Sequence, residues 1–232
     1  MKISGENIAF YTISSCDDVI IDNVKKLLMK GVPQLFIIDT RKERCEIETF
    51  MHLSDEDKSR IRLYKKGYDQ NNYLVTHSLV NYIYSSILKC SVNNLPYEFG
   101  KYKKPYISND FNYHYNISHS NNYAIVGILC SELGVDIEYY NEKFDYTSIA
   151  KGMFSLEDVK YIQRDRRKFF RLWVAKEAYL KYKGTGFYCD VNSIVITGAD
   201  NNTITLLDKS NMSEHSVFIM DNQEYIIGLS CT

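Results

Sequence analysis

The chain has 232 residues, 45% of them hydrophobic and 25% charged, and a formal net charge of −1 at pH 7. Its length and apolar content are sufficient to bury a core in one large domain or two small ones. A nearly neutral chain has no overall field that would attract nucleic acid or a membrane surface, and no apolar run of about 18 residues predicts a membrane-spanning helix. We therefore expect neither nucleic acid nor a membrane among its partners.

The six cysteines lie far apart in the sequence and form no Cys-x-x-Cys pair. Such spacing favours reduced thiols over a disulfide framework or a zinc site. The first residues also lack the apolar segment of a signal peptide. The expected location is therefore the cytoplasm, and a monomer is expected.

Apolar periodicity predicts the elements of the first part of the chain. Apolar runs at 8–13 and 35–39 predict strands. Ser54, followed by acidic residues that end at Asp57, predicts a helix start with a capping box. Apolar side chains that recur at helical spacing predict a longer helix over residues 73–89.

Residues 116–122 are polar and turn-forming, and they lead into an apolar run at 123–130 that predicts a strand. Serine hydroxyls, exposed backbone amides and a histidine can together hold phosphate oxygens. The alternative is a plain loop whose Ser and Asn side chains bond to their own backbone.

A second strand is predicted over 134–140, in a hairpin with 123–130. Alternation along a strand places Asp136 and Glu138 on one face, about 7 Å apart. Two carboxylates so placed repel each other unless a cation lies between them, and Mg²⁺ prefers such oxygen ligands. The alternative is an edge strand with a solvated acidic face.

Residues 169–183 predict a helix with apolar side chains around nearly its whole circumference, so most of it should be buried, and Gly184 and Gly186 follow as stop signals. Glu177 lies one turn after Trp173 and one turn before Lys181 within this surface. A buried charge is costly unless it is paired or bound to a metal. The helix therefore predicts a site that needs a carboxylate and an ammonium.

A basic run directly before and within the start of this helix is either a docking surface for an acidic protein or a solvated helix start. Ser155 predicts the cap of the preceding helix. Short strands are predicted over 191–197, 203–207, 216–220 and 225–231, and the irregular mixture of strands and helices predicts an α+β fold. The basic residues are Arg164, Arg166, Arg167, Lys168 and Arg171.

These motifs, taken in order, resemble those of the 4′-phosphopantetheinyl transferases of the larger, surfactin-synthetase-activating type. The resemblance is carried by Asn-Ile-Ser-His-Ser at 116–120, Gly-Val-Asp-Ile-Glu at 134–138, the Phe-Ser element at 154–158 and the Trp-x-x-Lys-Glu-Ala-x-x-Lys helix at 173–181. Residues 100–105 are similar to the Gly-x-x-Lys-Pro segment of this family. The first thirty or so residues carry no motif of the family.

The resemblance implies two halves related by a pseudo-twofold, each a small antiparallel sheet packed on a long helix, with the active site in the cleft between them. Residues 1–115 would form the N-terminal half, and residues 116–232 the C-terminal half with the metal-site motifs. The implied reaction is the Mg²⁺-dependent transfer of the phosphopantetheine arm of coenzyme A to a serine of an acyl- or peptidyl-carrier protein. Adenosine 3′,5′-bisphosphate would be released, and Mn²⁺ is an alternative metal.

The resemblance also implies roles for single residues. Asp136, Glu138 and Glu177 would bind the metal, while Glu177 as the base for the carrier serine stays open. Glu177 and Lys181 would be the catalytic pair, with Lys181 near the pyrophosphate. The implied coenzyme A contacts are Ser118, His119, Lys104, Lys176 and Lys181.

The chain departs from the family pattern at Asn72 and Asn81, where arginines that contact the nucleotide are usual. A neutral side chain cannot pair with a phosphate charge as arginine does. Two other functions stay open: a Mg²⁺-dependent phosphohydrolase, and a non-catalytic relative that binds nucleotide or carrier protein. Cations that would compensate for the missing arginines are Lys58, Arg60, Arg62, Lys65, Lys66, Lys101 and Lys104.

Overall fold

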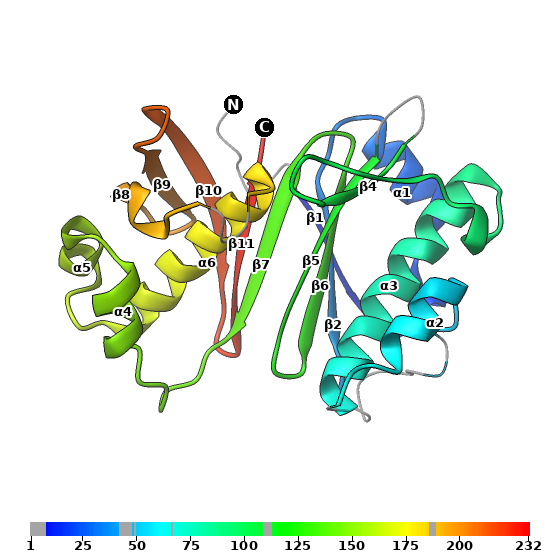
Figure 1. Cartoon of the computed structure of the whole chain (residues 1–232), viewed down its shortest axis with the longest axis horizontal. Coiled ribbons are helices and arrows are strands. Elements are labelled where there is room, and N and C mark those ends of the chain that lie inside the picture. Colours follow the sequence, from blue (N-terminus) through cyan, green and yellow to red (C-terminus); the bar gives the residue numbers. More distant parts are fainter. Residues whose placement is uncertain (1–7, 42–47, 49, 66, 109–112, 186–188) are drawn as a thin grey trace.

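The computed structural model describes residues 8–41, 48, 50–65, 67–108, 113–185 and 189–232. They form four layers, in which two β-sheets pack face to face and each carries helices on its outer face (Figure 1). The predicted α+β fold with two halves is confirmed. No helix of the described residues is both long and apolar enough to cross a membrane.

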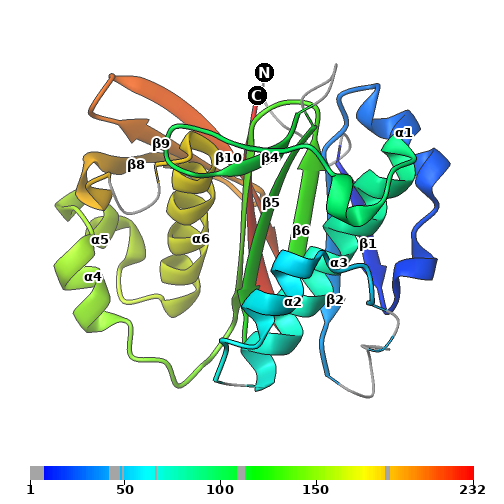
Figure 2. The ribbon, with the colours of Figure 1, turned by 45° about the vertical axis from the view of Figure 1, so that its right-hand side comes forward.

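The first sheet has the strand order β1-β2-β6-β5-β4-β3 and is antiparallel except for the parallel pair β1 and β2. Its outer face packs on α1 and α3, while α2 lies beside α3 (Figure 2). The strands are β1 (Ala9–Ile13), β2 (Gln34–Asp39), β3 (Tyr97–Phe99), β4 (Pro105–Ile107), β5 (Tyr113–Ser120) and β6 (Tyr123–Leu129), and the helices are α1 (Ile21–Leu28), α2 (Asp55–Ile61) and α3 (Gly67–Leu88).

The second sheet has the order β7-β11-β10-β9-β8, with every neighbouring pair antiparallel. Helix α6 packs across its outer face and contacts β7 and β11 most extensively. The strands are β7 (Leu133–Tyr139), β8 (Ile194–Ala199), β9 (Thr203–Asp208), β10 (Ser213–Asp221) and β11 (Tyr225–Cys231), and the helices are α4 (Thr147–Met153), α5 (Leu156–Ile162) and α6 (Arg166–Lys183). Short 3₁₀ turns are η2 (Cys16–Asp18), η4 (Val92–Asn94) and η6 (Val191–Ser193).

The predicted hairpin between 123–130 and 134–140 is wrong. Both strands exist, but β6 pairs with β5 and β2 in the first sheet, whereas β7 pairs with β11 in the second. Residues 130–132 carry the chain from one sheet to the other. Because both faces of β6 are buried, an apolar run with a short following turn did not reveal which strand it would pair with.

The polar residues at 116–120 are part of a strand and not a turn. Alternation explains this: Tyr113 and Tyr115 face the core under α3, while Ser118 faces β7. The proposed boundary between residues 115 and 116 therefore falls inside β5, and the change of sheet occurs at 130–132.

The predicted helix ends agree with the structure where the signal is local. Ser54 and Ser155 both form capping boxes, with Asp57 and Asp158 respectively. Helix α6 ends at Gly184, which adopts the left-handed conformation (φ 69°) that favours glycine. Gly186, a second stop signal in the sequence, lies outside the described residues.

Helix α6 lies unusually close to the second sheet, and two glycines make this approach feasible. A Cβ atom on Gly134 would lie within 3 Å of backbone atoms of Ala178, Lys181 and Tyr182, and one on Gly228 would lie 2.6 Å from the carbonyl oxygen of Val174. The backbone of the helix therefore rests directly on β7 and β11. This contact places the α6 side chains beside the carboxylates of β7.

We predict that Gly134→Ala separates the helix from the sheet and lowers the free energy of unfolding by at least about 1–3 kcal/mol, the usual cost of overpacking. Urea denaturation would measure the loss. Gly152→Ala is the matched control, because nothing lies within 4 Å of a Cβ at this position in α4. Helix propensity predicts that the control is stabilised by about 0.5–1 kcal/mol. Equal stability of the Gly134 variant and the parent would contradict the close contact.

Candidate active site

Asp136 is the buried centre of a group of charged side chains between β5, β7 and α6. Its side chain faces α6 and the residue is only 4% exposed. One carboxylate oxygen, Oδ1, accepts hydrogen bonds from Ser118 Oγ at 2.7 Å and from Lys181 Nζ at 2.7 Å. The other oxygen, Oδ2, is buried and has no hydrogen-bond partner.

Glu138 lies two residues further along the same face of β7. Ser120 Oγ donates to its Oε2 at 2.6 Å, and the Trp173 indole Nε1 donates to its Oε1 at 3.2 Å. Burial raises the pKa of Glu138 to about 7, and the charge of Asp136 adds to the rise. The hydrogen bonds from Ser120 and Trp173, and the charge of Lys181, oppose it.

Glu177 comes from α6, one turn from both Trp173 and Lys181. Burial raises the pKa of Glu177, the charge of Asp136 raises it further, and the ammonium of Lys181 lowers it. Asp136 therefore acts on both glutamates. The structure brings together the three carboxylates and the lysine that the sequence singled out from β7 and α6.

The donor set fits a hard divalent cation. Asp136 Oδ2 is buried without a hydrogen-bond partner, and the pKa values of Glu138 and Glu177 are raised. A divalent cation among these three residues would stabilise the ionised form of each carboxylate. In the described part of the chain, no group of three or more His, Cys, Asp or Glu side chains could hold a metal ion as it stands. Lys181 and Ser118 donate hydrogen bonds to one carboxylate oxygen of Asp136, and Ser120 donates one to Glu138.

Lys176 does not lie with Lys181. It is 1% exposed, and its Nζ forms a buried ion pair with Asp158 of α5. Asp158 also accepts hydrogen bonds from the backbone N–H groups of Ile196 and Ser155. The phosphate contact implied for Lys176 does not match this position, because about 100° of rotation per residue turns Lys176 away from the side of the helix that carries Glu177 and Lys181.

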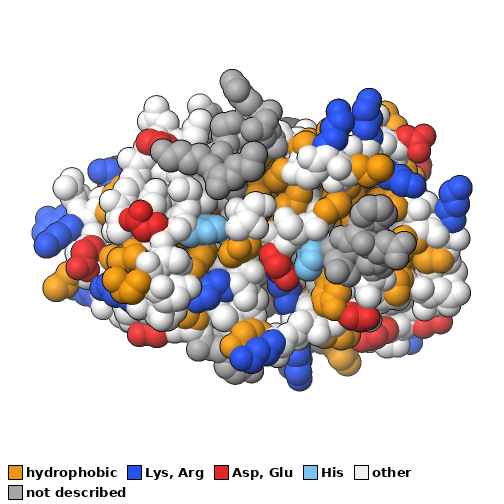
Figure 3. All heavy atoms as spheres, turned by 90° about the horizontal axis from the view of Figure 1, so that it is seen from above, with side chains coloured by type: hydrophobic (Ala, Val, Ile, Leu, Met, Phe, Trp, Pro, Cys, Tyr) orange, Lys and Arg blue, Asp and Glu red, His pale blue; other side chains and the backbone are white. Residues whose placement is uncertain are grey.

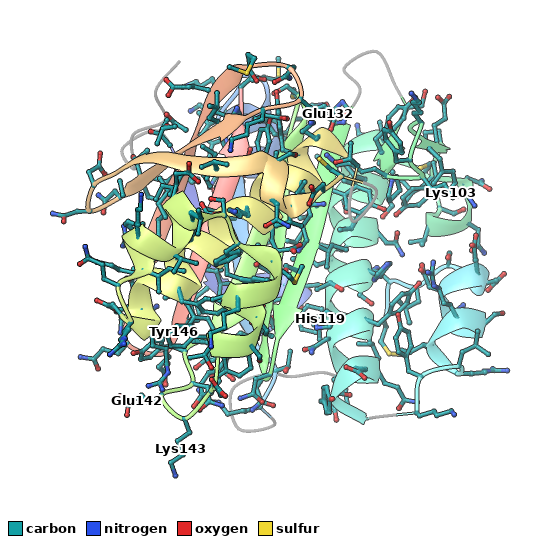
Figure 4. All side chains as sticks on the ribbon, turned by 60° about the vertical axis from the view of Figure 1, so that its left-hand side comes forward. Lys103, His119, Glu132, Glu142, Lys143 and Tyr146 are labelled. Atoms are coloured by element: carbon teal, nitrogen blue, oxygen red, sulfur yellow. The ribbon has the colours of Figure 1, made fainter. Side chains whose placement is uncertain are left out.

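Ser118 and His119 point in opposite directions because they are neighbours in a strand. His119 lines a cavity of about 220 Å³ with Arg60, Asp69 and His77, between β5 and the helices α2 and α3. Figure 4 shows His119 between the sheet and α3, the long cyan helix. Burial lowers the pKa of His119, the charges of Asp69 and Asp136 oppose this fall, and the charge of Lys181 adds to it.

Lys104 marks the opposite end of β7, where Figure 4 shows Glu132. Its Nζ donates to Glu132 Oε2 at 2.6 Å and to the carbonyl oxygen of Leu133 at 2.7 Å, and lies 3.5 Å from the carbonyl oxygen of Tyr182. Lys104 therefore ties the segment before β4 to the start of β7 and the end of α6. It also lines a cavity of about 170 Å³ with Lys183.

Asn72 and Asn81 are fully buried and bonded within the protein. Asn72 accepts from Thr40 Oγ1 and donates to the carbonyl oxygen of Asn121, while Asn81 bonds to Asp57 and Tyr97. Neither side chain faces the cavity that His119 lines. Of the cations proposed to compensate, Arg60 does line that cavity, and Lys66 lies outside the described residues.

The basic run at the start of α6 is largely engaged within the chain. Arg167 and Arg171 both pair with Asp221, at the end of β10, and Arg166 donates to the carbonyl oxygen of Phe144. These three side chains anchor the start of the helix, a role that the sequence did not suggest. Sequence reasoning also missed Ser120, although its spacing of two from Ser118 places it on the same face of the strand.

Comparison with known proteins gives a consistent result over most of the chain. Residues 132–230 match the model of the 4′-phosphopantetheinyl transferase superfamily, and residues 42–130 match that of the N-terminal part of 4′-phosphopantetheinyl transferases. A 4′-phosphopantetheinyl transferase of Aneurinibacillus migulanus is 30% identical over 168 residues, which are 70% of this chain and 68% of that protein. The transferase Sfp of Bacillus subtilis is 28% identical over 157 residues, 65% of this chain and 69% of Sfp.

Two further relatives extend the range of organisms. A Synechocystis protein whose name assigns it provisionally to the same transferases is 27% identical over 151 residues, 62% of this chain and 61% of that protein. The L-aminoadipate-semialdehyde dehydrogenase-phosphopantetheinyl transferase of Candida glabrata is 23% identical over 159 residues, 61% of this chain and 60% of that protein. The chain thus aligns with about three fifths of the length of these two proteins.

The position of Lys176 predicts a role in stability. Lys176→Met leaves the buried carboxylate of Asp158 without its partner, so the free energy of unfolding should fall by about 3–5 kcal/mol. Lys160→Met, on the exposed surface of α5, should change it by no more than about 0.5 kcal/mol. Urea denaturation of both variants checks this, and a small effect at position 176 would argue that the pair contributes little.

The raised pKa of Glu138 predicts a pH-dependent stability in the metal-free protein. The folded state keeps a proton up to about pH 7 that the unfolded chain releases near its usual pKa of 4.5, so this stabilisation is lost as the pH rises. The variant Glu138→Gln carries a glutamine side chain, which cannot ionise. From about pH 5 to about pH 8 its stability should therefore rise relative to the parent by roughly 2–3 kcal/mol.

Denaturation in EDTA at several pH values measures this change. Glu142→Gln, at an exposed position in the loop after β7, serves as the control and should keep a constant difference from the parent. A constant difference for Glu138→Gln as well would mean that this carboxyl group is ionised at its usual pKa.

Proposed function

Because the chain belongs to the 4′-phosphopantetheinyl transferase superfamily, we propose that it transfers the phosphopantetheine arm of coenzyme A to a serine of an acyl- or peptidyl-carrier protein. The other product is adenosine 3′,5′-bisphosphate. The observation that carries this proposal is the meeting of Asp136, Glu138, Glu177 and Lys181 at the contact of β7 with α6. We also propose a cytoplasmic monomer, in line with the scattered cysteines.

The carboxylates of β7 are the proposed metal ligands, with the unpartnered Oδ2 of Asp136 as the oxygen best suited to a cation. Mg²⁺, or Mn²⁺ in its place, when bound would neutralise the pyrophosphate of coenzyme A and stabilise the leaving phosphate. Glu177 is either a third ligand or the base. Its raised pKa favours the base, because a carboxylate whose pKa is raised holds a proton more strongly.

The chemical step forms one bond and breaks one. The serine oxygen attacks the phosphorus that carries the pantetheine arm, and the bond from this phosphorus to the bridging oxygen of the nucleotide breaks. In the role of base, Glu177 takes the hydroxyl proton of the serine. Lys181, whose ammonium already lies at the carboxylate group, is suited to hold the negative charge that collects on the phosphate oxygens.

The nucleotide phosphates require cations as well. In the cavity that His119 lines, Arg60 supplies a cation, and His77 and His119, whose pKa values burial lowers, supply hydrogen bonds. This lining, which also includes Asp69, supports a phosphate site there. Ser118 donates its hydroxyl to Asp136, so we assign it to the carboxylate group and not to the coenzyme. We likewise assign Lys176 to the buried pair with Asp158, and Lys104 to the rim of the cavity near the end of α6.

A carrier protein must reach this cleft without help from a strong overall field, since the net charge is −1. On the face of the molecule that Figure 3 shows, basic and acidic side chains are interspersed, without a broad area of one sign. The carrier is therefore expected to be recognised by local contacts near the site and not by long-range attraction.

The test is incubation of the protein with coenzyme A, Mg²⁺ and a broad panel of carrier proteins, followed by intact-mass measurement. One phosphopantetheine per carrier is expected, and EDTA should prevent it. Asp136→Asn should lower the rate by at least about 100-fold, because an electrostatic contribution to the transition state is of this size.

The variant Glu177→Gln separates the two roles of this residue. If Glu177 is the base, the variant should lose turnover and keep its Mn²⁺ affinity. If Glu177 is a metal ligand, the variant should lose both. Release of adenosine 3′,5′-bisphosphate with no modified carrier would identify a phosphohydrolase. Binding of coenzyme A with no turnover on any carrier would identify a non-catalytic relative.

A further inference from the structure

The side chains of β5 that face β7 form a row of contacts between the two sheets. Asn116 Oδ1 accepts from the backbone N–H of Val135 at 2.8 Å, Ser118 donates to Asp136, and Ser120 donates to Glu138. Every second residue of β5 from 116 to 120 therefore bonds to β7, at positions 135, 136 and 138. The two strands share no backbone ladder, so these side chains determine how they are aligned.

Glu138 is held from two sides by this arrangement. Ser120 of the first sheet donates a hydrogen bond to one carboxylate oxygen of Glu138, and Trp173 of α6 donates one to the other. The indole ring is itself fixed, because it packs against Phe154 and Phe169 with ring centroids 6.1 Å and 6.0 Å apart. Asp136 differs, because one of its oxygens has no partner.

We propose that Ser120 and Trp173 are positioning residues, which fix the carboxylate of Glu138 from both halves of the molecule and thereby set the affinity of the metal site. The inference rests on the proposed function for the identity of the metal. A carboxylate already held in one rotamer loses less conformational entropy when it binds a cation. Hydrogen-bond partners of ligating groups have effects of this kind in other metal sites.

The inference assigns a specific task to the last serine of the Asn-x-Ser-His-Ser motif. Its hydroxyl acts on a carboxylate of the opposite half and not on a phosphate of the coenzyme. It also gives the indole N–H of Trp173 a task separate from the packing of its ring.

The variants Ser120→Ala and Trp173→Phe remove one hydrogen-bond donor each and keep most of the side-chain volume. Titration with Mn²⁺, followed by electron paramagnetic resonance of the free ion, should show a metal affinity about 10-fold lower in each variant. Ser120→Thr restores the hydroxyl and should bind like the parent. Ser131→Ala, at a hydroxyl that lies far from Glu138 in the turn between the sheets, is the matched control.

A spectroscopic signal is also available, because Trp173 is the single tryptophan of the chain. Mg²⁺ draws charge from the carboxylate that accepts the indole N–H, so the tryptophan emission of the parent should shift on titration. In Ser120→Ala the shift should require about 10-fold more Mg²⁺. At saturating metal, the KM for coenzyme A should equal that of the parent.

Circular dichroism and thermal unfolding ensure that the compared variants are folded. Equal Mn²⁺ affinity in Ser120→Ala, Trp173→Phe and the parent would overturn the inference. A loss that Ser120→Thr does not restore, or a parent that binds no Mn²⁺ with or without coenzyme A, would overturn it as well. These measurements need no carrier protein, so their outcome is independent of whether a carrier is modified.

Discussion

The contact of the α6 backbone with β7 is the constraint on which the rest of the site depends. It exists because Gly134 presents no side chain to Ala178 and Lys181, and Gly228 allows the same approach on β11. Without it, the side chains of Glu177 and Lys181 would stand a full side-chain layer away from Asp136. The glycine two residues before the first carboxylate is therefore as necessary to the site as the carboxylates.

The close approach has an electrostatic cost. It brings three carboxylates into a buried space, and the pKa values of Glu138 and Glu177 are raised first by this burial and then by repulsion from Asp136. Lys181 offsets part of this repulsion, and hydrogen bonds from Ser120 and Trp173 offset more at Glu138. A divalent cation would relieve the remainder, in line with the metal-dependent reaction that we propose.

Two of the lysines of α6 differ in role, one in the packing of the fold and one at the site. Lys176 is enclosed with Asp158 and joins α5 and β8 to α6, while Lys181 stays partly exposed at the carboxylates. The halves are joined at both ends of β7, by Lys104 with Glu132 and by Tyr123 with Glu224. The site thus lies between two fixed points, which limits how far the halves can separate.

The sequence by itself determined the features that depend on local geometry. Strand alternation put Asp136 and Glu138 on one face, and helical spacing put Glu177 between Trp173 and Lys181; capping boxes gave two helix starts correctly. Only the tertiary structure decided which sheet each strand joined, that Lys176 would pair with Asp158, and that Ser120 would reach across to Glu138. These outcomes depend on partners distant in the chain, and the packing of two sheets and a helix selects such partners, which no local period encodes.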